Sequence, residues 1–100
     1  MNPFEAVAEP NRRRLLELLR SGEKAAGDLV KATGLSQPGA SKHLRQLREA
    51  GLVSVRAEGQ KRLYRLEASE LVALDSWLEP FRQFWTDRLD ALGDHLEREQ

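Results

Sequence analysis

The sequence predicts a mainly α-helical domain that carries one small β-hairpin. Apolar residues recur with the helical period of 3.6 from Pro10 to Ala50, interrupted by a turn near Gly34. After Gly51 the period changes to 2, which is typical of strands, and it becomes helical again beyond Ser69. A chain of 100 residues suits one small domain, so we expect these elements to form a single unit over residues 1–100.

The composition excludes several kinds of site. The chain has no cysteine, which excludes disulfides, thiolate metal sites and cysteine nucleophiles. No apolar stretch approaches the roughly 18 residues of a membrane span, and no signal-peptide pattern opens the sequence. No serine, histidine and aspartate are spaced to suggest a catalytic triad. We therefore expect a cytoplasmic protein with no membrane partner, no enzymatic activity, no catalytic residues and no cofactor.

The net charge of zero hides a strong asymmetry along the chain. Residues 36–65 hold seven Lys or Arg and two acidic residues, a balance of +5. Residues 66–100 hold three Lys or Arg and nine acidic residues, a balance of −6. A cationic middle followed by an acidic tail is typical of a chain that binds a polyanion on one face only.

The first third of the chain predicts two helices. Phe4 and Val7 can pack on one face of a short segment, and Pro10 then opens a helix that Ser21-Gly22 ends. The cluster Arg12–Arg14 lies in its first turns, where cations oppose the helix dipole; it serves a phosphate or acidic group, or is simply solvated. A second helix is expected from about Lys24 to Thr33, with Gly34 as its stop.

The next helix, from Ser36 to Ala50, has both ends marked. Ser36 is an N-cap residue, Pro38 lies in the first turn, and Gly51 is the expected C′ residue. Ala40, Leu44 and Leu47 form its apolar stripe. Because only a short glycine-containing turn separates it from the preceding helix, residues 24–50 predict a helix-turn-helix.

The polar face of this helix matches what a DNA major groove admits. Small or hydrogen-bonding residues come first and cations follow one turn later, which suits base edges and phosphates respectively. The alternative is an ordinary amphipathic helix with a solvated face. His43 has two interpretations, since it lies beside the apolar stripe: it packs against its neighbours, or it contacts a phosphate. The predicted DNA-binding residues here are Ser36, Gln37, Pro38, Ser41, Lys42, His43 and Arg45.

Residues 53–66 predict a β-hairpin that turns at Glu58-Gly59-Gln60. Val53, Val55 and Ala57 alternate with polar residues on the first strand, and Tyr64 and Leu66 do so on the second. A hairpin directly after such a helix is the wing of a winged helix. Its cations offer backbone or minor-groove contacts, unless the hairpin is only structural: Arg56, Lys61 and Arg62.

The C-terminal part predicts a short helix near Ser69–Leu74 and a longer one over Trp77–Glu97, because Pro80 disturbs the pattern and Ser76 to Glu79 resembles a capping box. Since the other helices already supply a core, we expect this apolar stripe to join a second copy of the chain. The predicted dimer-interface residues are Phe4, Trp77, Phe81, Phe84, Trp85, Leu89, Leu92 and Leu96.

The chain resembles the arsenical-resistance repressor (ArsR) family of winged-helix transcription regulators. The resemblance covers about Phe4 to Leu66 and is carried by Glu9-Pro10-Asn11-Arg12-Arg13, Leu35-Ser36-Gln37-Pro38, Ser41-Lys42-His43-Leu44 with Glu49-Ala50-Gly51-Leu52-Val53, and Tyr64-Arg65-Leu66. The tail around Phe84-Trp85 looks like the non-metal autorepressor branch. The resemblance implies a homodimeric repressor that joins through its terminal helices, binds double-stranded DNA at a palindromic operator, and releases it when an effector of unknown identity binds.

Two alternatives accompany this interpretation. A metal-responsive repressor would need a ligand set, but residues 25–30 contain no ligand pair and the tail offers only His95 with scattered carboxylates, so we expect no metal site. A winged helix that binds other proteins through the same face is the alternative of a different class.

Overall fold

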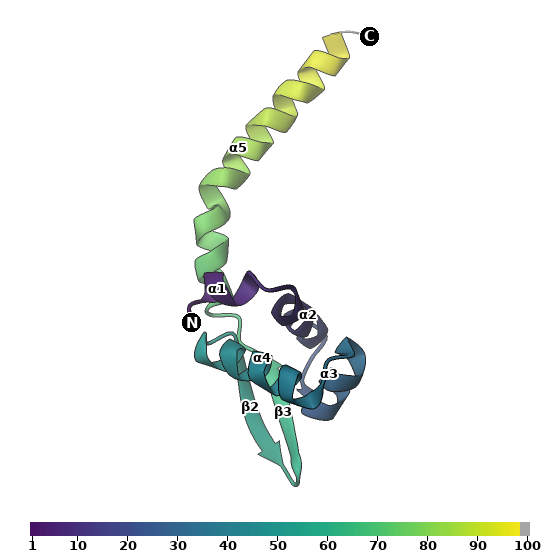
Figure 1. The fold of residues 1–100 in the computed structure, drawn as a ribbon. Helices are drawn as coiled ribbons and strands as arrows, with labels where there is room; N and C mark the ends of the chain where they lie inside the picture. The colour runs from purple at the N-terminus through teal and green to yellow at the C-terminus, as the bar shows by residue number, and fades with distance from the viewer. Residues whose placement is uncertain (99–100) are drawn as a thin grey trace.

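The computed structural model describes the backbone of residues 1–98 and the side chains of residues 1–93. Figure 1 shows a helical body with a hairpin on one side and a long helix that leaves from the other. The elements in chain order are α1 (Pro3–Val7), α2 (Pro10–Leu19), β1 (Lys24–Ala25), α3 (Ala26–Thr33), α4 (Gln37–Glu49), β2 (Val53–Glu58), β3 (Lys61–Leu66) and α5 (Leu71–Arg98). The mainly helical fold with a small β element is therefore confirmed.

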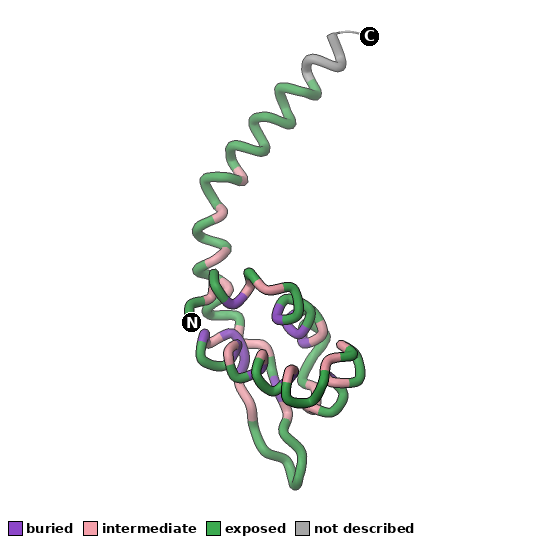
Figure 2. Tube along the Cα trace, in the orientation of Figure 1, coloured by how far each residue is buried: buried purple, intermediate pink, exposed green. Residues whose placement is uncertain are grey.

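The core lies between α2, α3, α4 and the base of the hairpin. Its fully buried large side chains are all leucines: Leu15, Leu19, Leu29, Leu44, Leu47 and Leu52. The predicted stripe of α4 is buried as expected, with Ala40 completing it. Figure 2 shows that burial is confined to this body, whereas the hairpin tip and most of α5 are exposed.

The helix-turn-helix has the capping that its sequence predicts. α3 ends at Gly34, whose backbone is left-handed (φ 71°). α4 begins after Ser36, whose Oγ accepts a hydrogen bond from the Gly39 N–H at 3.1 Å. Pro10 opens α2 at its first turn, also as predicted.

The hairpin pairs β2 with β3 in antiparallel register, with Val55 opposite Tyr64 and Glu58 opposite Lys61. The structure adds a third strand, because Lys24 and Ala25 pair with Tyr64 and Leu63 in the order β1-β3-β2. The predicted helix start at Lys24 was therefore two residues early. Lys24 and Ala25 form β1 instead, and this strand depends on pairing with β3, about 40 residues away in the chain. Local periodicity does not reveal such a partner.

The C-terminal region forms one helix where the sequence predicted two. α5 runs unbroken through Pro80, and Ser76 lies inside it instead of capping a new helix. Proline at this point removes one hydrogen bond, to the Ser76 carbonyl, and the apolar stripe stays in phase on both sides. The helix accommodates the proline by bending, as Figure 1 shows, and it does not break.

The three residues of the Arg12–Arg14 cluster have different surroundings. Arg13 and Arg14 are exposed, as the solvated alternative predicted; Arg13 also donates to the Val7 carbonyl, and Arg14 lies 3.8 Å from the acidic Glu17. Arg12 departs from both alternatives, because it is buried and donates hydrogen bonds within the protein.

Candidate nucleic-acid interface

The surface of α4 divides into three polar edges around its buried stripe. Gln37, Ser41, Arg45 and Arg48 line one edge and face a groove toward the hairpin. Pro38, Lys42 and Glu49 are exposed on the outward edge. His43 and Gln46 lie on the third edge, which faces α2. The three edges therefore face different surroundings: the groove, the solvent and α2.

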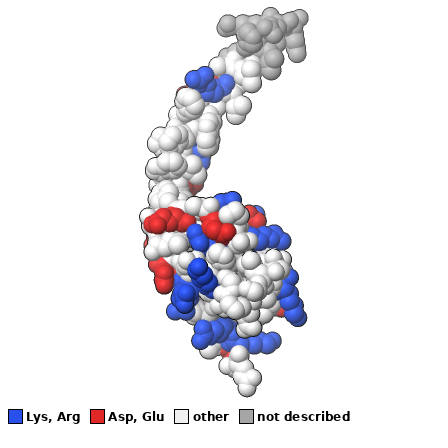
Figure 3. All heavy atoms as spheres, viewed as in Figure 1, with Lys and Arg blue, Asp and Glu red and all other residues white. Residues whose placement is uncertain are grey.

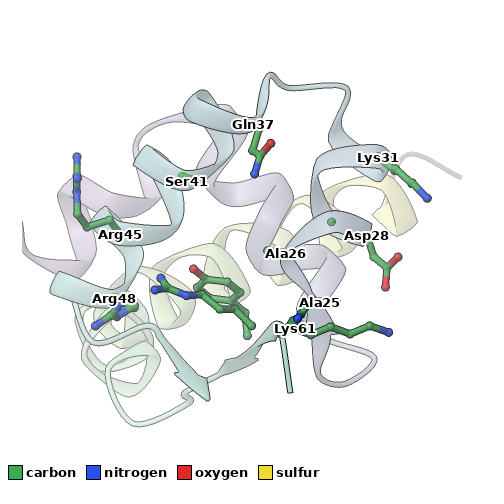
Figure 4. A pocket seen from close by; sticks show the side chains of 13 residues that line it. Ala25, Ala26, Asp28, Lys31, Gln37, Ser41, Arg45, Arg48 and Lys61 are labelled. Carbon is green, nitrogen blue, oxygen red and sulfur yellow. The ribbon is translucent and has the colours of Figure 1, made fainter. Parts of the chain in front are cut away.

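The groove lies between α3, α4 and the hairpin and has a volume of about 690 Å³. Its lining includes small residues of α3, among them Ala26 and Gly27, and Tyr64 of β3. Figure 4 shows Arg45 and Arg48 projecting from α4 at one end, with Lys31 of α3 at the other. A groove lined by several long cationic side chains is suited to an extended anionic polymer.

The charge of the groove is strongly positive. Five cations line it against the single carboxylate of Asp28: Lys31, Arg45, Arg48, Lys61 and Arg62. Among the side chains that the structure describes, none of these five cations has a carboxylate within 4.0 Å. Figure 3 shows Lys and Arg over much of the body down to the hairpin, whereas most of the Asp and Glu visible on this face lie near the point where α5 leaves the body.

Arg56 lies outside this groove. Its guanidinium donates two hydrogen bonds to the Glu23 carboxylate, at 2.9 and 2.7 Å. This bidentate pair ties β2 to the segment before β1. The hydrogen bond from Arg56 lowers the pKa of Glu23 below its ordinary value, despite an opposing desolvation. Arg65 is likewise engaged, with Glu67 at 2.9 Å.

His43 also lies outside the groove. Its Nδ1 atom is buried, has no hydrogen-bond partner among the described atoms, and lies 3.8 Å from Oε2 of Glu9. Partial burial raises the pKa of Glu9, but the Arg12 N–H and the nearby charges of His43 and Arg12 outweigh it and lower the pKa overall. The structure places His43 against the start of α2.

The structure therefore brings together Gln37, Ser41, Arg45, Lys61 and Arg62 from the predicted set in one groove. Ser36 acts as the N-cap, and Pro38 and Lys42 lie on the adjoining outward edge. Sequence reasoning missed Lys31 and Arg48, which line the same groove. Arg48 could have been found from its spacing of three residues after Arg45, whereas Lys31 depends on how α3 packs against α4.

Comparison with known proteins agrees with this geometry. The family described as "Bacterial regulatory protein, arsR family" matches residues 9–55, from the start of α2 into β2. The transcriptional repressor SdpR of Bacillus subtilis is 35% identical over 80 residues, which cover 80% of this chain and 89% of SdpR. The chain belongs to the ArsR family.

Solved structures of related proteins share the fold of this ArsR-family regulator. The crystal structure of a possible transcriptional regulator for arsenical resistance is 43% identical, with a TM-score of 0.74 over 92% of this chain and 93% of the other. The homodimeric winged helix-turn-helix DNA-binding domain of Mb0332 from Mycobacterium bovis is 30% identical, with a TM-score of 0.65 over 84% and 78% of the two chains. This protein is thus a winged helix-turn-helix transcriptional regulator, as the sequence predicted.

The described part of the chain contains no helix that is long and apolar enough to cross a membrane. Among the described side chains, no three His, Cys, Asp or Glu residues converge as metal ligands would. Asp94, His95 and Leu96 lie outside the side chains that the structure describes.

Proposed function

We propose that this ArsR-family regulator is a homodimeric repressor that acts in the cytoplasm by binding a palindromic DNA operator, and not by catalysis. The groove of unpaired cations beside α4 carries this proposal. The N-terminal half of α4 enters the major groove, where Gln37 and Ser41 reach base edges. Arg45, Lys42 and the wing (β2–β3) cations Lys61 and Arg62 bind the flanking phosphates.

Two additional phosphate contacts follow from the same groove. Arg48 and Lys31 line this groove together with the wing cations. We assign both to the DNA backbone, because neither has a carboxylate within 4.0 Å among the described side chains and because guanidinium and ammonium groups bind phosphate well. Arg56 is left to its ion pair with Glu23.

The exposed side of α5 supports the homodimer. Several of its large apolar side chains are about half exposed or more, for example Trp77 at 56% and Leu89 at 67%. Monomeric proteins rarely expose a contiguous apolar surface of this kind. The homologous domain of Mb0332 is described as a homodimer, which agrees with a second copy as the occupant. Two-fold symmetry then predicts half-sites one helical turn apart, ~34 Å.

Selection of bound sequences from a random duplex pool tests this function. We expect an inverted repeat to be enriched, and its binding to weaken steeply between two salt concentrations, as phosphate contacts require. If the protein fails to bind any duplex even in dilute buffer, the proposed function is wrong and the recognition face serves another partner, such as a protein.

A further inference from the structure

Arg12 connects three helices although almost none of it reaches solvent. The residue is 8% exposed. Its Nε donates to the Ala6 carbonyl at 2.8 Å and a terminal nitrogen donates to the Glu5 carbonyl at 3.0 Å, both in α1. Its other terminal nitrogen donates to Oε1 of Gln46 in α4 at 2.9 Å. One guanidinium on α2 thus binds the end of α1 and the recognition helix at the same time.

The other side of α1 contacts α5. The Phe4 ring meets Trp77 edge to face, with centroids 5.8 Å apart, and Trp77 in turn packs on Phe81 at 4.8 Å. Within the described residues α5 packs against α1, and its first residue, Leu71, packs against the core. One set of contacts therefore runs from α5 through α1 and Arg12 to Gln46 of α4, beside the direct packing of α1 on α4.

The N-terminal end of α2 makes a second contact with α4, one helical turn before Gln46. The Glu9 carboxylate accepts a hydrogen bond from the Arg12 N–H at 2.9 Å and lies 3.8 Å from His43. His43 and Gln46 are three residues apart on the edge of α4 that faces away from the groove. This edge of the recognition helix is thus held by α2 and takes no part in the groove that we assign to DNA.

We infer that Arg12 is a positioning residue that sets the orientation of α4 relative to α5, and thereby the distance and angle between the two recognition helices of the dimer. The inference rests on the proposed function. Arg12 itself is not expected to contact DNA, because it is almost completely buried and each of its three side-chain nitrogens already donates a hydrogen bond inside the protein. Its effect appears only when both recognition helices must meet their half-sites simultaneously, since that is when their relative geometry matters.

The test compares three duplexes made from the sequence that the wild-type protein selects. One carries the selected palindrome, one carries a single half-site, and one carries the palindrome with two extra base pairs between the half-sites. Arg12→Met removes the donors and keeps most of the aliphatic volume. Gln46→Met removes only the bond to α4 and leaves the α1 bonds of Arg12 in place. Arg13→Met, on the same helix but exposed and bonded only to Val7, is the matched control.

For Arg12→Met and Gln46→Met we expect a loss of about tenfold in affinity for the palindrome and less than about twofold for the single half-site. We also expect the penalty for the two extra base pairs to shrink, because a less firmly held helix tolerates the wrong phase. Arg12→Lys should recover part of the discrimination, since it restores one charged donor. Sedimentation should show that every variant remains a dimer, and Arg13→Met should match the wild type.

Equal losses on the palindrome and the single half-site, or an unchanged spacing penalty in both variants, would overturn the inference. If Arg12→Met does not fold at the assay temperature, Gln46→Met decides the question alone. A wild-type protein that binds the palindrome no better than the single half-site contradicts the proposed dimeric function itself, which is a separate outcome.

Discussion

Arg45 and Arg56 show how the same residue type takes different roles within one cationic segment. Both side chains are exposed, and both were among the residues predicted from the sequence to contact DNA. Arg56 finds the Glu23 carboxylate 33 residues away in the chain, whereas Arg45 lines the groove without a carboxylate within 4.0 Å among the described side chains. At the residue scale, the partner that the fold supplies decides whether a cation holds the protein together or remains available for a ligand.

This difference leads to a prediction on salt dependence. Arg45→Ala should weaken duplex binding and reduce the slope of log affinity against log salt by about one, because one phosphate contact is lost. Arg56→Ala serves as the control and should leave the slope unchanged. Binding titrations at four or more salt concentrations measure both slopes. An unaltered slope in Arg45→Ala would contradict its assignment to phosphate.

Glu9 gives a prediction on pH. Its pKa in the folded protein is lowered from the ordinary value of 4.5, so the folded state favours the carboxylate more than the unfolded state does. The unfolded state therefore binds more protons, and this contribution to stability is present above about pH 4.5 and lost as the pH falls through the folded-state pKa. Thermal unfolding of wild type and Glu9→Gln should differ near pH 7 and converge in acid. A constant difference across this range would show that the carboxylate charge is not involved.

The ends of α4 show how an element is fixed by a few backbone groups. The Gly51 N–H donates to the Arg48 carbonyl at 2.9 Å and the Leu52 N–H donates to the Leu47 carbonyl at 3.0 Å, which is the Schellman pattern. Gly51 has a φ of 78°, and a Cβ there would lie 2.8 Å from Cγ of Glu70. This turn directs the chain from the recognition helix into the wing, so it sets the angle between the two.

Substitution of this glycine should therefore be costly. Gly51→Ala is expected to destabilise the fold by about 1–2 kcal/mol, because an L-residue is strained in the left-handed region and Glu70 must move. Gly27→Ala is the matched control: Gly27 lies in α3 with nothing within 4 Å of the added carbon, and the change should stabilise by about 0.5–1 kcal/mol. Urea unfolding of the two variants and the wild type measures the sign of each change in the free energy of unfolding. Equal effects would mean that the turn is not constrained as described.

The whole molecule is much longer in one direction than in the other two. Its extents are 64 × 25 × 20 Å, because α5 projects well beyond the body that the leucine core holds together. Along this projection the apolar side chains are exposed, and Arg88 lies over the Phe84 ring at 5.0 Å. A projecting helix with an apolar stripe is only marginally stable in water by itself. It is stabilised when the stripe is buried against the same helix of a second copy of the chain.

The dimer can be tested at this scale. Leu89→Glu should produce monomers in sedimentation, because it places a charge in the proposed interface, where it would be desolvated without a partner. The affinity for a palindrome should fall toward that for a single half-site. Gln83→Glu, at an exposed position on the face of α5 opposite the apolar stripe, is the control and should remain a dimer. If Leu89→Glu is still dimeric, the apolar stripe of α5 is not the interface.

The sequence by itself determined the start of α2, the two ends of α4, the extent of the hairpin, the buried stripe of α4 and the family. These features depend on residues close together in the chain, whose periodicity and capping chemistry act locally. Only the tertiary structure decided that Arg12 is buried, that Arg56 pairs with Glu23, that Lys31 and Arg48 share a groove, and that Lys24–Ala25 form a strand. It also decided that α5 continues through Pro80. The first four features depend on groups that folding brings together from distant parts of the chain. The continuation of α5 depends on whether the loss of one hydrogen bond at Pro80 ends the helix or only bends it.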